Sequence, residues 1–494
     1  MSTAPLETRA STVPSEVADR LRSIVGERNC IVESSQLRTY ESDGLTSFHA
    51  MPGIVVLPAS TEEVAQIVRV AREASLPIVP RGAGTGLSGG ALPVPGCVLV
   101  GMSRMRSILE IDLENGWMRV QPGVINLDVS KRIGAEGYYY APDPSSQSVC
   151  TIGGNVAENS GGAHCLKYGF TVNHVLGARI VLSDGEVVDL GGPVADAPGY
   201  DLLGVLVGSE GTLGIVTEVV LRILRKPQAT RTFLATFPST EEAGNAVSAI
   251  IAGGIVPAAI EMMDRLAIVA AKAATGVDWP DVGAVLLMDV DGPLAEVEHT
   301  SAAAIEMACA AGALEIRRPK DEDERALLWK GRRSAFAAVG RISPNYVVQD
   351  GVIPRSKIAE VLGDIETLSR ESGLRIANVF HAGDGNLHPL VLYDAKVPGQ
   401  EKLAEDVAGE ILRVCLRFGG SITGEHGVGA DKTAFMAEMF NESDLETMNR
   451  IRCAFDPQNR FNPGKVFPTP RLCGDRPGIY RPHSAELSGQ ADRV

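Results

Sequence analysis

The stretch from Pro80 to Gly90, which reads Pro-Arg-Gly-Ala-Gly-Thr-Gly-Leu-Ser-Gly-Gly, constrains the fold more than any other part of the chain. Five of its last nine residues are glycine. Because glycine adopts positive φ and leaves its backbone N–H groups open, such a loop forms a concave nest for an anion. We expect such a nest to bind a diphosphate. The alternative is that this stretch is an ordinary glycine-rich surface loop.

The flanks of this loop argue against the common dinucleotide-binding fold. Gly84 to Gly89 satisfies the G-x-G-x-x-G fingerprint, and a short strand from Leu76 to Pro80 precedes it. That fold needs a helix next, but Pro93 and Pro95 follow, and then an apolar strand from Cys97 to Met102. The order strand, glycine loop, strand therefore predicts a pyrophosphate cradle outside the Rossmann fold.

Composition narrows the class of protein. A chain of 494 residues predicts two or three domains, and a net charge of -15 argues against nucleic acid and anionic membranes as direct partners. No apolar run reaches the ~18 residues of a membrane span, and the N-terminus lacks a hydrophobic signal core, so we expect a cytoplasmic protein. The eight cysteines form no Cys-x-x-Cys pair, which favours neither a disulfide framework nor an iron–sulfur site.

The first half of the chain reads as α/β. Residues 1–50 are predicted to be an N-terminal arm with a helix from Ser15 to Ile24. From residue 51 a strand from Ile54 to Leu57 is followed by a helix from Thr61 to Ala74, opened by Ser60. The glycine loop comes next, so residues 51–228 are expected to form one domain.

Three further loops rich in turn residues follow within that domain. Each of them alone is better explained as a turn, but four such loops within about 140 residues suit an extended cofactor that runs through one domain. The three loops are Val120 to Val124, Pro142 to Ser146 leading to Ile152 to Asn155 and on to Asn159 to Gly162, and Gly208 to Gly214.

The sequence pattern changes at Lys226 and Pro227, where the glycine-rich loops stop and the second half begins. Strands and helices then alternate in the rhythm of a ferredoxin-like cap domain, for which we expect residues 229–420. A C-terminal segment from 421 to 468 and a flexible tail from 469 to 494 complete the division. The predicted cap elements are a strand from Leu234 to Phe237, a helix from Thr240 to Ala252, a strand from Val285 to Val290 and a helix from Glu296 to Ala311.

The four loops together resemble the FAD-binding domain of the vanillyl-alcohol-oxidase (PCMH-type) superfamily. The resemblance implies an α+β fold in which the first loop cradles the FAD diphosphate and the later loops line the ribityl chain and isoalloxazine. Because the first loop has no His, Cys or Tyr, we expect a dissociable flavin. The residues that the resemblance assigns to FAD are Pro80, Arg81, Gly82, Ala83, Gly84, Thr85, Gly86, Leu87, Ser88, Gly89, Pro122, Gly123, Pro142, Asp143, Ser145, Ser146, Gly153, Gly154, Asn155, Asn159, Gly161, Gly162, Glu210, Gly211, Gly214, Ile215, Val216 and Asn462.

Two of the eight histidines stand close together in the second half. Apolar runs flank a turn at Gly383 to Asn386, so a hairpin would place His381 directly across from His388. A buried histidine is usually a hydrogen-bonded core residue, but Glu425 and His426 lie between two glycines and add a carboxylate and a third imidazole. Two histidines and one carboxylate suit a divalent cation such as Zn²⁺ or Mn²⁺.

A metal beside a flavin suits the oxidation of a 2-hydroxy acid. The hydroxyl has a pKa far above 7, and its proton must leave as hydride departs from the carbon that carries the hydroxyl. A cation chelated by the hydroxyl and one carboxylate oxygen lowers that pKa and fixes the carbon over the flavin. His426 is then a candidate general base.

The second half resembles the branch of this superfamily that contains D-lactate dehydrogenases, D-2-hydroxyglutarate dehydrogenase and bacterial glycolate oxidase. The resemblance assigns the metal to His381, His388 and Glu425, the base to His426, and recognition of the substrate carboxylate to Arg332 in Trp-Lys-Gly-Arg. Arg333 is the alternative, one position along. Guanidinium suits a planar carboxylate.

Residues 329 to 354 and the Pro-Asp-Pro-Ser-Ser run are most similar to FAD-linked subunits of bacterial glycolate oxidase. Phe336 and Val348 replace a Thr and a Lys of the hydroxyglutarate enzymes, which disfavours a second carboxylate on the substrate. The resemblance implies oxidation of glycolate to glyoxylate, with electrons passing to companion flavin and iron–sulfur subunits that would hold the protein at the inner face of the membrane. A stand-alone D-lactate dehydrogenase and a flavin-binding subunit without chemistry are the alternatives.

Overall fold

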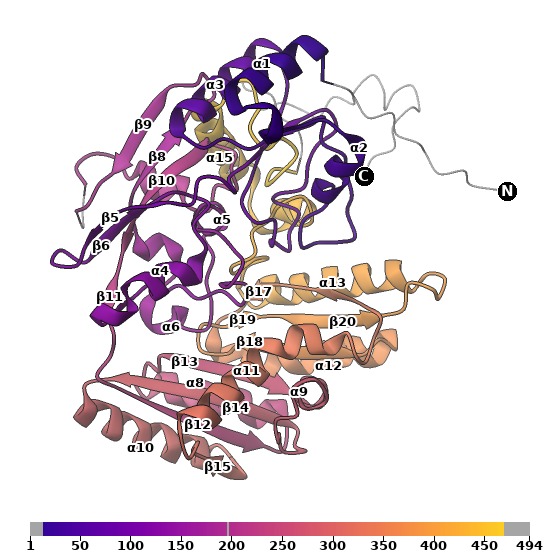
Figure 1. Ribbon diagram of the computed structural model, residues 1–494. Coiled ribbons are helices and arrows are strands. Elements are labelled where there is room, and N and C mark those ends of the chain that lie inside the picture. The colour runs from indigo at the N-terminus through magenta and orange to yellow at the C-terminus, as the bar shows by residue number, and fades with distance from the viewer. Residues whose placement is uncertain (1–12, 195–196, 469–494) are drawn as a thin grey trace.

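The computed structural model describes residues 13–194 and 197–468, in which two α/β halves lie one against the other (Figure 1). The N-terminal half carries the glycine loop, and the second half begins with β12 (Ala229–Phe237). Residues 1–12 of the expected arm and the expected tail from 469 lie outside the described residues. Within those ranges no helix is both long and apolar enough to cross a membrane.

The first sheet contains the strands on either side of the glycine loop, in the order β1-β2-β4-β3. Strands β2, β4 and β3 run parallel, and β1, which comes from the expected arm, pairs antiparallel with β2. No helix lies between β3 and β4, so the loop is outside a Rossmann unit, as predicted. The elements are α1 (Ser15–Val25), β1 (Cys30–Ile31), α2 (Ser34–Leu37), β2 (Ile54–Val56), α3 (Thr61–Glu73), β3 (Ile78–Arg81) and β4 (Val98–Gly101).

The second sheet is antiparallel, with the order β5-β6-β10-β8-β9, and a short pair β11-β7 lies beside it. Residues 152–158 were expected to be loop but form the helix α5, because the Thr151 hydroxyl accepts the Gly154 N–H at its start and Asn159 ends it at φ 54°. The elements are β5 (Ile108–Asp112), β6 (Trp117–Val120), α4 (Asn126–Ile133), β7 (Tyr138–Tyr139), α5 (Ile152–Glu158), α6 (Cys165–Tyr168), β8 (Val175–Val181), β9 (Val187–Gly191), α7 (Leu202–Leu206), β10 (Ile215–Arg222) and β11 (Leu224–Arg225).

The second half is built on a nine-stranded sheet. Its first four strands lie in the order β15-β12-β14-β13, which is the order of a ferredoxin-like unit and agrees with the predicted rhythm. The sequence reading missed β13 and α9, which lie between the predicted helix and the second predicted strand. The elements of this unit are β12, α8 (Thr240–Ala252), β13 (Ala259–Asp264), α9 (Arg265–Thr275), β14 (Ala284–Gly292), α10 (Leu294–Ala310) and β15 (Glu315–Arg317).

The sheet continues through β18 into short strands that carry the site. Helices cover both faces: along β12, Phe233 and Ala235 point into one apolar layer and Leu234 into the other. The remaining elements are α11 (Glu322–Val339), β16 (Asn345–Val348), β17 (Gly351–Val352), α12 (Ile358–Ser372), β18 (Ile376–His381), β19 (Asn386–Leu387), β20 (Pro389–Tyr393), α13 (Gln400–Arg417), α14 (Met436–Met439) and α15 (Glu442–Phe455).

The C-terminal segment returns to the first sheet. Phe461 forms a parallel bridge with Ile78 and is buried in the core of the first half, and the Asn462 N–H donates to the Ile78 carbonyl at 2.8 Å. The first described helix, α1, and the segment around Phe461 therefore both lie on the half that carries the glycine loop.

Candidate active site

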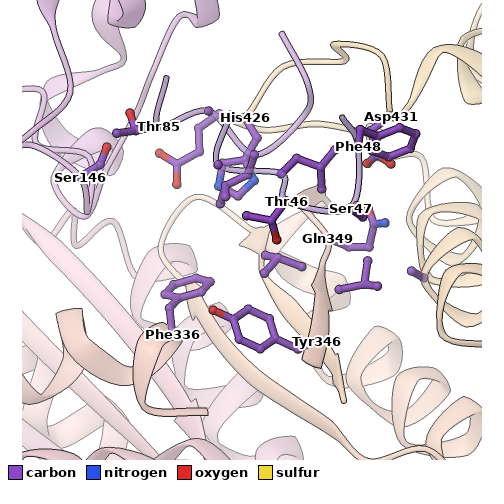
Figure 2. Close-up of a pocket in the computed structure, with 18 of the residues that line it drawn as sticks. Thr46, Ser47, Phe48, Thr85, Ser146, Phe336, Tyr346, Gln349, His426 and Asp431 are labelled. Atoms are coloured by element: carbon purple, nitrogen blue, oxygen red, sulfur yellow. The ribbon is translucent and has the colours of Figure 1, made fainter. Parts of the chain in front are cut away.

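Two adjoining cavities lie where loops of both halves meet. The larger has a volume of about 1300 Å³ and contacts the glycine loop, the cap residues Phe336 and Tyr346, and His426 (Figure 2). The smaller, of about 80 Å³, continues into the first half between β3, α5 and the 208–214 loop. Four residues line both cavities, so the pair forms one elongated hollow. They are Gly82, Ala91, Gly154 and Glu158.

Most residues predicted to bind FAD line this hollow. At Gly82 a Cβ would lie 2.4 Å from the Thr151 hydroxyl, so only glycine lets the loop approach α5 this closely. The predicted residues that line one cavity or both are Pro80, Arg81, Gly82, Ala83, Gly84, Thr85, Gly86, Leu87, Pro122, Ser145, Ser146, Gly153, Gly154, Asn155, Glu210, Gly211, Gly214, Ile215, Val216 and Asn462.

Eight predicted FAD residues do not line either cavity and instead hold the loops together. Asp143 pairs with His164, Asn159 caps α5, and the Ser88 hydroxyl donates to the His426 carbonyl at 2.9 Å. The Ser88 carbonyl also accepts the N–H groups of Ala430 and Asp431, which ties the glycine loop to the C-terminal segment. The eight are Ser88, Gly89, Gly123, Pro142, Asp143, Asn159, Gly161 and Gly162.

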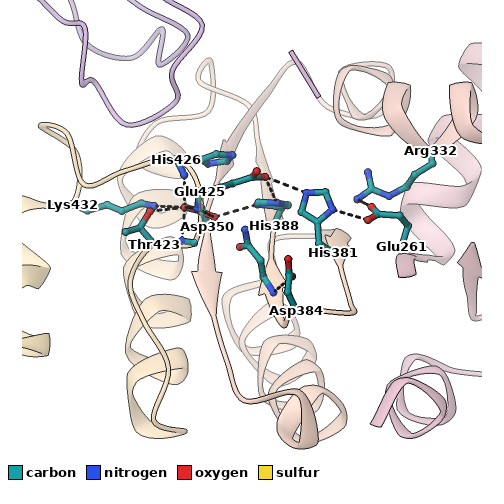
Figure 3. A network of polar contacts seen from close by, with 12 residues as sticks. Glu261, Arg332, Asp350, His381, Asp384, His388, Thr423, Glu425, His426 and Lys432 are labelled. Carbon is teal, nitrogen blue, oxygen red and sulfur yellow. Dashed lines mark hydrogen bonds and ion pairs between the residues drawn. The ribbon is translucent and has the colours of Figure 1, made fainter. Parts of the chain in front are cut away.

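The turn that carries Glu425 and His426 is fixed from two sides by buried carboxylates. Asp350 accepts the backbone N–H groups of residues 424, 425 and 426 at 2.9–3.3 Å and the Thr423 hydroxyl at 2.6 Å (Figure 3). Glu210 accepts the N–H groups of residues 428 and 429, each at 2.6 Å. Consecutive N–H groups that converge on one carboxylate require an irregular turn, so the adjacent side chains of Glu425 and His426 can face different partners.

The two histidines of the hairpin meet, but not through the predicted register. His381 at the end of β18 pairs with Asn386 of β19, so the expectation that it lies directly across from His388 is wrong by two residues. A shift of two residues keeps a side chain on the same face of the sheet. The two rings still meet edge to face, with centroids 5.1 Å apart.

Both histidines direct Nε2 at one oxygen of Glu425. The distances to Glu425 Oε1 are 3.2 Å from His381 and 3.1 Å from His388. Behind the rings, His381 Nδ1 lies 2.7 Å from Glu261 and His388 Nδ1 lies 3.7 Å from Asp350. A carboxylate behind each imidazole is the arrangement that orients metal-binding histidines.

The charges of this group fit a divalent cation. Burial would lower the pKa of His381, but Glu261 and Glu425 raise it well above its usual value. The His381 ring is therefore protonated between the two carboxylates. The same contacts hold the pKa of Glu425 well below its usual range despite burial. Glu425 Oε2 has no hydrogen-bond partner among the described residues. A site that binds a proton tightly with two nitrogens and a carboxylate is one in which a metal ion can replace that proton.

His426 lies beside this group and lines the larger cavity. Its ring stacks on that of His388 with centroids 5.0 Å apart. Burial lowers the pKa of His426 to about 4, although Asp350 acts in the opposite direction. The imidazole is therefore neutral near pH 7 and has a nitrogen lone pair available for a proton.

The two arginines considered for a substrate carboxylate have different surroundings. Arg332 is buried and its guanidinium forms an ion pair with Glu261, so its charge is already matched (Figure 3). Arg333 is exposed and lines the larger cavity. Arg332 thus extends a buried row of alternating charges that runs through Glu261 and His381 to Glu425.

Two features of the site had no clear signal in the sequence. Residues 44–48 of the N-terminal arm line the larger cavity, and Figure 2 shows Thr46, Ser47 and Phe48 beside it. Glu261 lies on β13, a strand that the sequence reading missed. A carboxylate inside an otherwise apolar strand, Ala-Ile-Glu-Met-Met, was the available hint.

Comparisons with known proteins agree with these two halves. Residues 52–191 match the FAD binding domain family, and residues 226–466 match the C-terminal domain of the FAD linked oxidases. Similar proteins include the glycolate oxidase subunit GlcD of Escherichia coli K12, 46% identical over 94% of this chain and 93% of that protein. GlcD of Bacillus subtilis is 38% identical over 92% and 97%. A D-lactate dehydrogenase of Anaerostipes hadrus is 33% identical over 84% and 90%.

Solved structures share the fold at low identity. P-cresol methylhydroxylase superimposes with a TM-score of 0.78 at 19% identity, covering 92% of this chain and 98% of that one. A 4-ethylphenol oxidase from Gulosibacter chungangensis gives 0.75 at 21%, covering 92% and 97%. The predicted α+β architecture with a PCMH-type FAD-binding domain is therefore confirmed.

Proposed function

The chain belongs to the FAD-linked oxidase family, and from this premise we propose that it oxidises glycolate to glyoxylate as an FAD-dependent 2-hydroxy-acid dehydrogenase. One observation carries the proposal: a single cavity is walled on one side by glycine-rich backbone and on the other by Glu425 and His426. An alcohol bound in that cavity would lie beside groups that can accept its hydroxyl proton. It would also be within reach of a flavin that can accept hydride from its carbon.

FAD fits the elongated hollow as a dissociable cofactor. The backbone loops around Gly82 and Gly154 offer N–H groups without bulky side chains, and Asn462 adds a side chain from the C-terminal segment. When bound, FAD supplies the acceptor for the hydride that leaves the substrate carbon. Because the loop from Arg81 to Gly90 contains no His, Cys or Tyr, acid precipitation should release the flavin into the supernatant.

His381, His388 and Glu425 would hold a divalent metal ion, either Zn²⁺ or Mn²⁺. Such an ion lowers the pKa of the substrate hydroxyl. Glu261 and Asp350 would keep the two imidazoles in place from behind, since each carboxylate is buried next to an Nδ1. The unpartnered Oε2 of Glu425 supports this assignment, because a buried carboxylate oxygen without a donor is costly.

His426 would act as the general base. Its ring is neutral because of burial, lines the cavity and is held by the Asp350 contact to its backbone N–H. It would accept the hydroxyl proton while the substrate carbon loses hydride, leaving a C=O double bond. The imidazolium would then lie close to the buried Asp350 carboxylate, which stabilises the positive charge.

The substrate carboxylate needs a cation, for which Arg332 is the proposed anchor and Arg333 the alternative. In the first case the guanidinium would share its charge between Glu261 and the substrate. In the second it would reach the substrate from the cavity wall. Replacing Arg333 by Met should raise KM at least tenfold with a smaller change in kcat if Arg333 is the anchor, and should change neither if Arg332 is. Steady-state kinetics of the Arg333 variant separate the two assignments, because Arg332→Met would also leave Glu261 buried without its cation.

One apolar part of the cavity wall favours a small substrate with one carboxylate. Phe336, which packs 5.5 Å from the His388 ring, lines it together with Tyr346 and Val348. These side chains offer no positive charge to a second carboxylate. Glycolate and D-lactate differ by one methyl group, which a pocket discriminates by only ~1–3 kcal/mol, so D-lactate is the alternative substrate.

Electrons would leave through companion subunits. Among the described residues, the two groups able to hold a metal both consist of histidine and carboxylate side chains, so an iron–sulfur relay would have to be on another chain. We therefore propose companion flavin and iron–sulfur subunits that carry electrons to membrane quinone and place this protein peripherally at the inner face of the cytoplasmic membrane.

The test is to compare substrates and acceptors with the purified, FAD-loaded chain. We expect kcat/KM for glycolate to exceed that for D-lactate, and an artificial dye to be reduced faster than oxygen. Preference for D-lactate would favour the alternative enzyme. Rapid peroxide formation without a partner would contradict the proposed relay, and inactivity on both acids would contradict the proposed reaction.

A further inference from the structure

Glu158 occupies a position that the reaction described above does not use. It is the last residue of α5 and one of the four residues that line both cavities. A cofactor that occupies both cavities passes this junction. Glu158 Oε2 also points toward Gly427, the residue after the proposed base His426, since a Cβ there would lie 2.2 Å from it. A redox ring placed beside His426 for hydride transfer would therefore lie close to the Glu158 carboxyl group.

A second carboxylate, that of Glu210, crowds Glu158. A Cβ at Gly427 would lie 2.2 Å from Glu158 Oε2 and 2.9 Å from Glu210 Oε1, so both groups face the same point. Glu210 accepts two backbone N–H bonds of 2.6 Å, from Val428 and Gly429, which favour its ionised form. Glu158 Oε2 is buried and has no hydrogen-bond partner among the described residues.

Two adjacent carboxyl groups in a buried place cannot both be ionised. Burial and the Glu210 charge raise the pKa of Glu158 well above its usual value; Asp43 acts in the same direction and Lys432 opposes it. Burial also raises the pKa of Glu210, against its two N–H donors and the charges of Lys432 and Lys465. The pair therefore carries a single proton, which the N–H donors at Glu210 leave on Glu158.

We propose that Glu158 is a neutral carboxylic acid that donates a hydrogen bond from its O–H to the FAD ring and so favours the reduced cofactor. The inference rests on FAD occupying the two cavities, as proposed above. A donor to the ring binds more strongly once the ring has gained electrons, because hydrogen bonds to charged acceptors are stronger than those to neutral ones. Glu158 would thus tune the cofactor by direct contact, without taking part in proton removal from the substrate.

Two variants of the FAD-loaded protein distinguish the effect of a hydrogen-bond donor at position 158 from the effect of a negative charge there. Glu158→Gln keeps a neutral donor of nearly the same shape, whereas Glu158→Leu has no donor. A dye-equilibrated midpoint potential gives the ratio of affinities for reduced and oxidised FAD. We expect Glu158→Leu to lower this ratio about tenfold, which is about 30 mV for a two-electron couple, and Glu158→Gln to change it less than about threefold. The matched control, Glu405→Gln on the rim of the larger cavity, should leave the ratio unchanged.

The sign of the change distinguishes the outcomes. If Glu158 were ionised, both substitutions would remove a negative charge and raise the ratio, which would overturn the proposal. An unchanged ratio in Glu158→Leu would also overturn it, because no hydrogen bond would have been lost. A wild-type chain that takes up no FAD would overturn the proposed function together with this inference.

Infrared difference spectra provide a second measurement that needs only the conservative variant. Reduction of the wild-type flavin should shift a C=O band of a protonated carboxylic acid, and this band should be missing from Glu158→Gln. The result does not depend on the substrate. A wild-type spectrum without any carboxylic-acid band, or with a band that persists in Glu158→Gln, would contradict the inference.

Discussion

The glycine-loop half and the cap half bring groups to the same cavity in different ways. Around Gly82 and Gly154 the cavity wall is mostly backbone, and it keeps its shape because glycine has no side chain at these positions. Behind Glu425, which lines the cavity, the cap half has a row of buried ionisable groups in contact with one another, the charge row, which extends from Arg332 to Asp350. A backbone cradle can lose one contact and still bind an extended ligand, whereas one missing charge leaves its neighbour buried and unpaired.

The largest effect is expected from Glu425→Gln in the charge row. The amide has no negative charge for the two Nε2 atoms that meet it, so the proposed metal site would lose its central ligand. Turnover should fall about 10³-fold or more, while the bound FAD stays close to one per chain, because no loop of the cradle changes. Metal analysis and the flavin absorbance of the same sample measure both.

The matched control for this prediction is Glu405→Gln, which removes the same charge from the cavity rim without touching a histidine. Its turnover should stay within about twofold of wild type. If Glu425→Gln kept both metal and turnover, the division into a cradle and a catalytic charge row would be wrong.

Asp350→Asn should produce an intermediate effect in the same row. The side chain keeps its size but can no longer accept all of its donors, which are three backbone N–H groups, the Thr423 hydroxyl and the buried ammonium of Lys432. The turn would then hold Glu425 and His426 less well, and we expect a 10–100-fold loss of metal affinity. Titration of the apoprotein with Zn²⁺ or Mn²⁺ measures it, and FAD binding without substrate should be unaffected. Unchanged metal affinity would mean that the flanking glycines set the turn by themselves.

Gly82→Ala tests the other side of the comparison. Its Cβ would lie 2.4 Å from the Thr151 hydroxyl that caps α5, so either the loop or the cap must move. Loss of an N-cap costs about 1 kcal/mol, so we expect FAD affinity to fall roughly fivefold, with full activity at saturating FAD. Gly363→Ala is the matched control, because a Cβ there meets nothing within 4 Å. An activity that excess FAD fails to restore would show that the cradle is as intolerant as the charge row.

The same difference explains how far the sequence could be interpreted. Glycines and prolines mark a backbone-built site locally, and most residues around Gly82 and Gly211 that were predicted to bind FAD line the two cavities. Rare histidines marked the charge row, and His381 and His388 do meet at Glu425. The predicted hairpin register failed because the Gly385 turn at φ 81° makes His381 pair with Asn386, a geometry that residue types alone do not set.

The partners behind the histidines were beyond prediction for a physical reason. Glu261 is separated from His381 by more than a hundred residues, and Asp350 acts on the turn at Glu425 through the pairing of short strands. A buried carboxylate has no local sequence pattern, since only the folded sheet determines what it faces. For the same reason residues 44–48, a mixture of apolar and small polar residues without a motif, could not be assigned to the cavity.

The smallest effect concerns the contact between the two halves. Asp143, which the resemblance assigned to FAD, instead lies 2.8 Å from His164 Nδ1, and the His164 ring stacks on Trp329 of the cap. Burial lowers the pKa of His164, but the charge and hydrogen bond of Asp143 outweigh it and raise the pKa to about 9. A raised histidine pKa adds stability that is complete below about pH 6.5 and is lost as the pH rises through about 9.

Asp143→Asn should remove this dependence. We expect the wild-type Tm to fall by roughly 2–4 °C more than that of the variant between pH 6.5 and 10, as measured by calorimetry on the FAD-loaded protein. His164→Gln should show the same flattened profile, because it removes the titrating group itself. FAD affinity should be unchanged in Asp143→Asn. A loss of FAD affinity without any change in the pH dependence of Tm would show that Asp143 contributes to FAD binding and not to the contact between the two halves.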